Sequence, residues 1–381
     1  MFCKRVNTSR IAALLIMIGV ASSLSACITD SASSGGKIHA EESVIANNNT
    51  PTLADIARDA PGLAYVDNIP HSNSGVVSDI SIGNLAPVDH LTPGTGDCIT
   101  PPPGAVSETG IRIIEQSQQI ADNLRQNLGR SCAGAAINTL KQVDAQGFTV
   151  LANLPKPSEA SRFLNCNRSD YDLGTLVHES SHMVTQSHFT GREFSMLLPD
   201  GKLHTVPYDE HFFKLTELQV DLPQRDIDHY AETYIFGGGQ QQSFPWMLDE
   251  LNAYTHELIT MTHLSQAGIK SVTSSYRDGP TRFMHYVELY LRRARVAHPE
   301  QWEKIASEPK YLDLIQNLWH HAESAISESC PHDELGIASE GIFPEVYTPD
   351  NLNELHELFA KAGKKFVTQQ GMTCKVPKQI T

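Results

Sequence analysis

Apolar residues recur at near-helical spacing between Ser107 and Gly129. Ile114, Ile120 and Leu124 belong to this pattern. Serine favours the N-cap of a helix, and glycine is the residue that most often ends one. The pattern therefore predicts an amphipathic helix at the start of the ordered part of the chain.

Two segments have the composition of strands. Residues 147–154, GFTVLANL, form a short apolar run that Pro155 and Pro157 end, which predicts a strand. Residues 192–208 contain two strand-like runs around Pro-Asp-Gly, a turn sequence that predicts a β-hairpin.

The remaining pattern is helical. A helix is predicted over residues 172–186, and another over 245–264, where Pro245 suits the first turn. Residues 281–325 and 351–362 continue the helical periodicity.

This order of elements predicts an α+β fold with a strand-rich part packed on the helix at 172–186 and a mostly helical C-terminal half. We expect a single domain over residues 107–381, because no repeat or second signature divides it. Residues 27–60 are small and polar and predict a flexible tether. Residues 61–106 are rich in Pro, Gly and Asn and predict an irregular segment.

Residues 1–26 have the pattern of an export signal. Basic residues precede an apolar run over 11–20 that is too short to span a membrane. The following LSAC resembles the lipobox of bacterial lipoproteins, which implies cleavage before Cys27 and lipid attachment to it. The resemblance implies a lipid anchor in the bacterial cell envelope. Ile28 fits sorting to the outer membrane, with the protein facing the periplasm or the cell surface.

Charge and cysteine content narrow the range of partners. Removal of the signal lowers the formal net charge from −15 to −18, because the signal carries three basic and no acidic residues. This balance disfavours a nucleic-acid partner. Besides Cys27, five cysteines remain, which allow at most two disulfides, and no CxxC spacing indicates a cysteine metal site. They are Cys98, Cys132, Cys166, Cys330 and Cys374.

Residues 175–184, TLVHESSHMV, are the segment that indicates chemistry. His178 and His182 are four residues apart, so on a helix they face the same side and present two imidazoles to one metal ion. Glu179 lies beside this face. There it can take a proton from a water on the metal without binding the metal itself.

The segment resembles the HExxH consensus of the zincin metallopeptidases. Thr175 stands three residues before the first histidine, the residues around the pair are uncharged, and Val184 supplies the apolar residue two after the second histidine. The resemblance implies a zincin-like domain, a Zn²⁺ cofactor and hydrolysis of peptide bonds. It covers residues 173–254 only.

A catalytic zinc needs a third protein ligand, and Glu250 is the first candidate. The segment ELNAY, from Glu250 to Tyr254, resembles the third-ligand helix of the gluzincin clan. Those enzymes often carry Asp where this chain has Tyr254, so the partners of the two histidines stay open. Tyr254 shares a helical face with Glu250 and is either a donor to the oxyanion or a core residue. Asp249 is expected to be a solvated charge near a helix start.

Two other residues remain candidates for the third ligand. His188 completes the three-histidine spacing of the metzincins, but Thr185 stands where that clan has a glycine. Asp209, in PYDEH, fits the aspzincin arrangement, although the further signature of those enzymes is absent.

We therefore expect a zinc-dependent peptidase in which His178, His182 and Glu250 hold the metal and Glu179 is the general base. The expected partners are a peptide or protein substrate and, through Cys27, a membrane. The alternative is a surface lipoprotein whose non-catalytic zinc-binding module acts in partner binding or envelope assembly.

Overall fold

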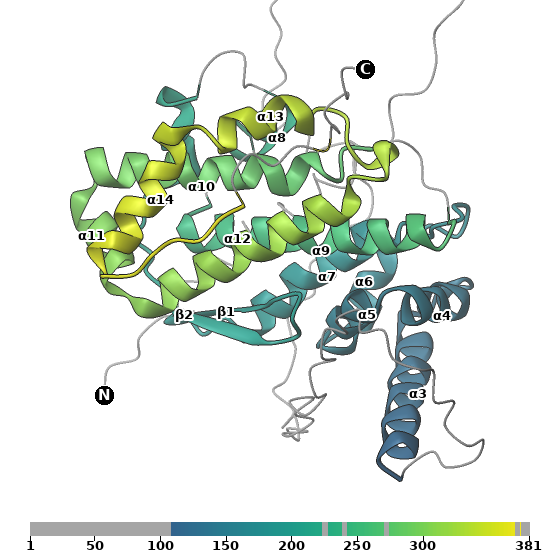
Figure 1. Cartoon of the computed structure of the whole chain (residues 1–381). Helices are drawn as coiled ribbons and strands as arrows, with labels where there is room; N and C mark the ends of the chain where they lie inside the picture. Colours follow the sequence, from purple (N-terminus) through teal and green to yellow (C-terminus); the bar gives the residue numbers. More distant parts are fainter. Residues whose placement is uncertain (1–107, 223–227, 238–241, 270–273, 370–373, 375–381) are drawn as a thin grey trace, which may run out of the picture. The chain divides into compact units, whose positions relative to one another are not determined.

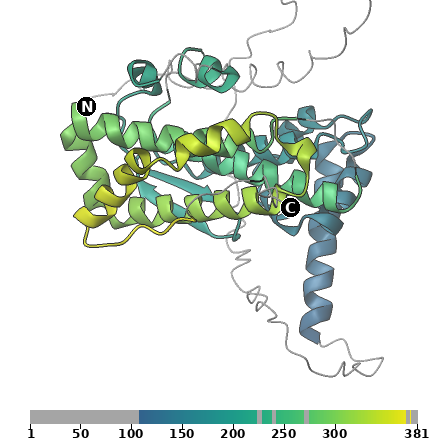
Figure 2. The ribbon, with the colours of Figure 1, turned by 45° about the horizontal axis from the view of Figure 1, so that its top comes forward.

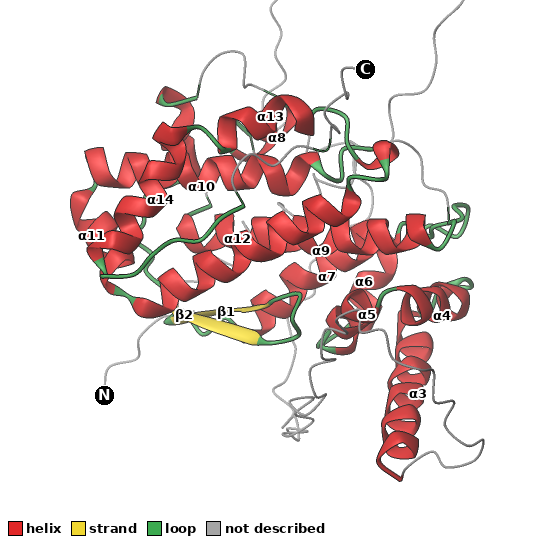
Figure 3. Cartoon of the chain, viewed as in Figure 1, coloured by secondary structure: helices red, strands yellow, loops and turns green. Residues whose placement is uncertain are grey.

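The described part of the protein is mostly helical, and a single short hairpin supplies its strands (Figure 3). The computed structural model describes residues 108–222, 228–237, 242–269, 274–369 and 374. The predicted signal at 1–26, Cys27 with its tether, the segment at 61–106 and Cys98 lie outside these residues. Within the described part, no helix combines the length and the hydrophobicity needed to cross a bilayer.

The α-helices and strands follow one another along the chain as labelled in Figure 1. They are α3 (Glu108–Leu128), α4 (Ala133–Val143), α5 (Ala145–Ala152), α6 (Pro157–Ala160), α7 (Leu173–His188), β1 (Glu193–Leu197), β2 (Leu203–Pro207), α8 (His229–Tyr234), α9 (Phe244–Gln266), α10 (Asp278–Ala297), α11 (Pro299–Ser307), α12 (Pro309–Ser329), α13 (Ser339–Val346) and α14 (Pro349–Lys361). Short 3-10 turns at Ser161–Phe163, Leu215–Val220 and Asp333–Leu335 join them.

Helix α9 is the element around which the others pack. It contacts α7, α10 and α12, and nearly all of its side chains are buried. Its buried residues are mostly apolar, but Asp249, Glu250 and Glu257 are also buried and need partners inside the protein. In the turned view of Figure 2, the green to yellow helices α10, α12 and α14 lie close together, and α10 contacts both of the others.

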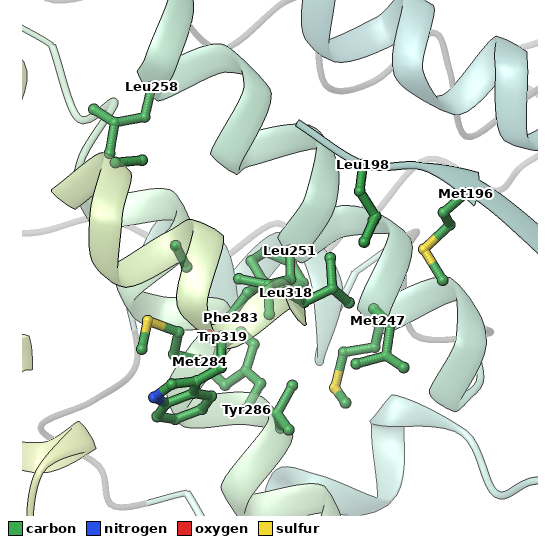
Figure 4. Packing of buried hydrophobic residues seen from close by; sticks show 14 of the residues in the cluster. Met196, Leu198, Met247, Leu251, Leu258, Phe283, Met284, Tyr286, Leu318 and Trp319 are labelled. Carbon is green, nitrogen blue, oxygen red and sulfur yellow. The ribbon is translucent and has the colours of Figure 1, made fainter. Parts of the chain in front are cut away.

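The hydrophobic core lies between α9, α10 and α12, and it extends to the hairpin (Figure 4). Large side chains from all three helices interdigitate there, and each stabilises the fold by about 1.5–3 kcal/mol on burial. Those labelled in the view are Met196, Leu198, Met247, Leu251, Leu258, Phe283, Met284, Tyr286, Leu318 and Trp319.

The predicted hairpin is confirmed. Strands β1 and β2 pair antiparallel, with Glu193 opposite Pro207 and Leu197 opposite Leu203, and Gly201 takes the positive φ of 77° that the turn requires. The carbonyl oxygen of Leu197 accepts hydrogen bonds from two α9 side chains and so ties the hairpin to that helix.

The strand predicted over 147–154 is wrong, because this segment belongs to the helix α5. Asp144 begins the helix by accepting a hydrogen bond from the backbone N–H of Gln146. Short apolar runs fit a buried strand and a buried helix equally well, and tertiary contacts decide between them. Here Gly147 is buried against the side chains of Asp144 and Thr260, so the packing against α9 favours the helix.

The predicted strand-rich part is therefore not found in the described residues. They contain two strands, and both follow the motif helix instead of preceding it. What is shown is a mixture of many helices with one small antiparallel sheet.

Two disulfides join segments that are distant in sequence. Cys132 pairs with Cys166, and Cys330 pairs with Cys374, with Cα atoms 5.4 and 4.8 Å apart. These pairs join four of the five cysteines that lie outside the predicted signal and the predicted lipidation site. The first holds the loop before α7 against the start of α4, and the second holds Cys374 against the end of α12.

Candidate metal centre

The candidate site lies where α7 and α9 pack against each other in opposite directions. Gly174, at the start of α7, faces Met261 near the end of α9, and a Cβ at Gly174 would lie 2.7 Å from the Met261 sulfur. At the other end, Thr185 of α7 donates a hydrogen bond to Asp249 near the start of α9. The glycine permits the close approach that brings HESSH of α7 to the first turns of α9.

Three donor atoms converge between the two helices. The Nε2 atoms of His178 and His182 lie 3.2 Å apart, and Oε2 of Glu250 lies 3.8 and 3.4 Å from them, respectively. Two donors of a tetrahedral zinc site, each about 2.1 Å from the ion, lie about 3.4 Å apart. In the part of the chain that the structure describes, this is the one group of three or more His, Cys, Asp or Glu residues placed to hold a metal.

The environment of Glu250 fits a cation at this position. Its Oε1 atom accepts a hydrogen bond of 2.7 Å from Gln242, but its Oε2 atom is buried with no hydrogen-bond partner. A buried carboxylate oxygen without a partner is costly unless it coordinates a cation. The unpartnered oxygen is the one that lies near both histidines.

Each histidine donates a hydrogen bond from its Nδ1–H group to a carboxylate of α9. His178 Nδ1 lies 3.2 Å from Glu257 Oε2, and His182 Nδ1 lies 2.6 Å from Asp249 Oδ2. A proton held on Nδ1 leaves Nε2 free to bind a metal, and this arrangement is common around metal-binding histidines. These contacts answer the question of the partners of the two histidines, which the sequence left open.

The expectation for Asp249 is corrected by the structure. Its side chain is 0% exposed, so it is not a solvated charge at a helix start. Its two oxygens accept from His182 and from Thr185, both at 2.6 Å. The residue therefore orients His182 and does not face solvent.

The carboxylates give the site an excess of negative charge. Four of them, on Glu179, Asp249, Glu250 and Glu257, surround two imidazoles, and all four are at most 8% exposed. Buried carboxylates require compensation by cations or protons. Burial by itself would lower the pKa of His182, but Glu250 and Asp249 hold that pKa well above its usual value. Without a metal, protons on the imidazoles thus compensate part of the negative charge that a divalent cation would compensate.

Glu179 lies beside the histidines and is 5% exposed. Burial raises the pKa of its carboxyl group above the ordinary value, although His178 and His182 partly oppose this shift. A raised pKa brings a carboxylate closer to the range in which it can both take up and release a proton near neutral pH. This direction of the pKa shift is the one that a general base requires.

Tyr254 contacts both the site and a second tyrosine. Its ring lies edge-on to the ring of His178, with centroids 4.4 Å apart, and its hydroxyl lies 2.9 Å from that of Tyr234 on α8. Only one proton occupies a bond between two hydroxyl groups, so the second hydroxyl proton of the pair is available to another acceptor. Tyr254 also stacks on Phe283 and is partly buried, so it belongs at once to the core and to the border of the site.

The structure does not bring the other two proposed third ligands to the histidines. His188 lies at the end of α7, where its Nδ1 is 2.9 Å from the carbonyl oxygen of Val184. Asp209 forms an ion pair with Lys304 and accepts from the backbone N–H of His211. Neither residue belongs to the group of converging donors.

Sequence reasoning missed Glu257, Gln242 and Tyr234. Glu257 stands seven residues after Glu250, two helical turns on the same face, so this spacing contained a usable signal. Gln242 and Tyr234 lie outside α9 and reach the site only through the tertiary fold. Comparison with known proteins adds nothing to these assignments: no family model, curated protein or solved structure matches the chain.

Proposed function

We propose that this chain is a zinc-dependent peptidase whose metal is held by His178, His182 and Glu250. The observation that carries the proposal is the unpartnered Oε2 of Glu250, a buried carboxylate oxygen within 3.8 Å of two imidazole nitrogens whose other ring nitrogens are held by carboxylates. Carboxylate and imidazole donors in this number are typical of catalytic zinc sites, which keep a position open for water.

Zinc at this site would act as a Lewis acid that polarises the substrate carbonyl and acidifies water. The protein residues supply the other parts of the reaction. Glu179 accepts the proton of the attacking water on its carboxylate and later passes it to the leaving amine. Asp249 and Glu257 keep the two imidazoles oriented throughout, because they hold the Nδ1 protons.

The tyrosine pair supplies a donor for the charge that develops on the carbonyl oxygen. The paired hydroxyls of Tyr234 and Tyr254 lie at the border of the site, and one of their protons is not used within the pair. A fixed donor of this kind, aimed at the developing oxyanion, is worth several kcal/mol in hydrolytic enzymes. This gives Tyr254 one of the two roles that the sequence left open and makes Tyr234 its partner.

Zinc stoichiometry tests the site, and hydrolysis tests the function. We expect one zinc per purified full chain, and loss or marked weakening of binding in Glu250→Ala, whereas the matched control Glu300→Ala, on the exposed surface of α11, keeps the metal. Glu179→Gln should bind zinc like the parent and lose hydrolysis of a mixed peptide pool. A Glu179→Gln variant that still hydrolyses peptides would exclude the proposed mechanism. A zinc-loaded parent without peptidase activity would favour the non-catalytic zinc-binding module.

A further inference from the structure

An aromatic cluster lies close to the candidate metal centre along the chain and has no part in the proposed chemistry. It is formed by Phe189 at the end of α7, Tyr208 after β2 and Trp246 in the first turn of α9, and we call these three residues the aromatic platform. Their rings contact one another and the fully buried Phe194: the Phe189 centroid lies 4.8 Å from that of Tyr208, and the Trp246 centroid lies 4.6 Å from that of Phe194.

The platform continues the helical faces that carry the metal ligands. Trp246 stands four residues before Glu250 on α9, and Phe189 stands seven residues after His182, directly after α7. Residues at these spacings follow one another along one helical face. Because α7 and α9 run in opposite directions, Phe189 and Trp246 both lie past the same end of the metal-ligand group. Their ring centroids are 5.8 Å apart.

The spacing also suits an extended peptide. Four helical residues advance about 6 Å along an axis. Two residues of an extended chain advance about 6.6 Å, and their side chains point to the same face. A peptide with its reacting carbonyl at the metal would therefore place a nearby side chain on the platform.

Partial exposure distinguishes the platform from the core. Phe194 beneath it is 0% exposed, whereas Phe189, Tyr208 and Trp246 are only partly buried and keep surface for another apolar group.

We propose that the aromatic platform is a specificity subsite that takes an apolar, preferably aromatic, side chain of the substrate close to the cleaved bond. The inference rests on the proposed peptidase function and names its substrate class. Apolar side chains gain most from burial against aromatic rings, and charged side chains gain least. The acidic surroundings of the metal do not provide such a preference, so it has to come from the platform.

Peptide hydrolysis by the zinc-loaded full chain tests the subsite. Quenched fluorescent peptides would carry Phe, Leu, Gly, Asp or Lys at one varied position on either side of the bond. We expect kcat/KM for Phe or Leu at one position to exceed that for Gly by roughly ten- to a hundredfold. Trp246→Ala should remove this preference by lowering kcat/KM for the Phe and Leu peptides toward that for the Gly peptide, and Trp246→Phe should retain it. Val296→Ala, which changes an apolar residue 69% exposed on α10, is the control for general surface effects.

Binding provides a readout that does not depend on turnover. In Glu179→Gln, a Phe-containing peptide should change tryptophan fluorescence at concentrations at least tenfold lower than the Gly peptide. The signal reports on Trp246, because Trp302 and Trp319 are only 9% and 0% exposed. Tyr208→Ala, which keeps Trp246, should weaken binding of the Phe peptide but not of the Gly peptide. This variant shows whether the effect of replacing the tryptophan arises from misfolding.

The outcomes separate the two proposals. Hydrolysis without any apolar preference, or a preference that Trp246→Ala and Tyr208→Ala leave unchanged, overturns the subsite and leaves the peptidase standing. If the zinc-loaded parent hydrolyses no peptide, the proposed function fails, and equal binding of Phe and Gly peptides then overturns the subsite as well.

Discussion

Asp249 and His182 form a contact of 2.6 Å between a buried carboxylate and a partly buried imidazole, and the next residue in the chain, Glu250, faces the opposite nitrogen of the same ring. Two neighbouring residues at the start of α9 thus hold His182 from both sides. One fixes the proton on Nδ1, and the other lies near Nε2, where a metal would bind. The orientation of this ligand therefore depends on Asp249 as much as on α7.

Asp249→Asn keeps the size of the side chain but removes its charge. We expect zinc affinity to fall about ten- to a hundredfold, because partners that orient a metal-binding histidine typically contribute that much. The measurement is a competition titration of the purified chain against a zinc chelator. Thr185→Val, which removes only the hydrogen bond to the other oxygen of Asp249, is the matched control and should weaken binding less. Equal affinities of Asp249→Asn and parent would contradict the orienting role.

Zinc binding should release protons and weaken as the pH falls. Burial alone would lower the pKa of His182, but Glu250 and Asp249 raise it well above 6.5, so at neutral pH the metal-free ring carries a proton that zinc must displace. Isothermal titration at pH 7 in two buffers of different ionisation enthalpy measures this release. Asp249→Asn should release fewer protons, because it loses a carboxylate that holds the proton. Binding enthalpies that are the same in both buffers would argue against the linkage.

The stability of the metal-free protein should depend on pH in the matching direction. Because the folded pKa of His182 lies above its unfolded value, its contribution is fully present below about pH 6.5 and is lost as the pH rises through the folded pKa. Zinc removes this dependence, since it replaces the proton. Thermal unfolding with and without zinc between about pH 6 and pH 9 would show it, and parallel curves would contradict it.

Local patterns predicted the elements that carry the site. The turn sequence Pro-Asp-Gly identified the hairpin, the segment around HESSH identified α7, and helical periodicity identified α9. The three candidate metal ligands could be predicted from the sequence because each lies in a short recognisable segment. His178 and His182 share one helical turn, and Glu250 lies in a short segment with a recognisable composition. Each of these inferences needs only the chain within a few turns.

What escaped prediction depends on contacts between elements. GFTVLANL has strand-like composition, yet Asp144 caps it as a helix and α9 buries it. The sequence predicts a solvated charge at Asp249, whereas the antiparallel packing of α7 and α9 buries it. Tyr234 meets Tyr254 from a six-residue helix whose sequence gives no indication of that contact.

Glu288 offers a test of buried charge remote from the ligand group. It is 0% exposed on α10, and both of its carboxylate oxygens lack hydrogen-bond partners. Burial raises the pKa of Glu288 well above 4.5; Arg292 opposes this shift, and Glu354 adds to it. His285 Nδ1 lies 3.6 Å away, but burial and two arginines lower the pKa of His285 to about 3, so at neutral pH it is uncharged.

Glu288→Gln should stabilise the protein at neutral pH by about 1 kcal/mol or more. Because the folded pKa of Glu288 is raised, its contribution is fully present below about pH 4.5 and is lost as the pH rises through the folded pKa. Glutamine cannot ionise, so the stability of the variant should vary less with pH than that of the parent. Urea unfolding at several pH values measures the difference, with the exposed Glu300→Gln as control. A variant with the same pH dependence as the parent would show that Glu288 is not buried in its neutral form.

Gly279 controls the position of Tyr254. A Cβ atom at Gly279 would lie 2.4 Å from Cδ1 of Tyr254, closer than atoms can pack, so Gly279→Ala must displace the tyrosine ring or α10. The ring would then move relative to His178 and to Tyr234. We expect a loss of about 1–3 kcal/mol of stability, typical of overpacking, and a lower kcat with zinc still bound.

Gly341→Ala separates this effect from the ordinary consequence of replacing a helical glycine. Gly341 lies in α13, where an added Cβ meets nothing within 4 Å, so alanine there should stabilise the helix by about 0.5–1 kcal/mol. Zinc content, thermal unfolding and peptide hydrolysis would be compared for the two variants. If Gly279→Ala were as stable and as active as Gly341→Ala, the close packing of Tyr254 on α10 would have no part in holding the tyrosine pair at the site.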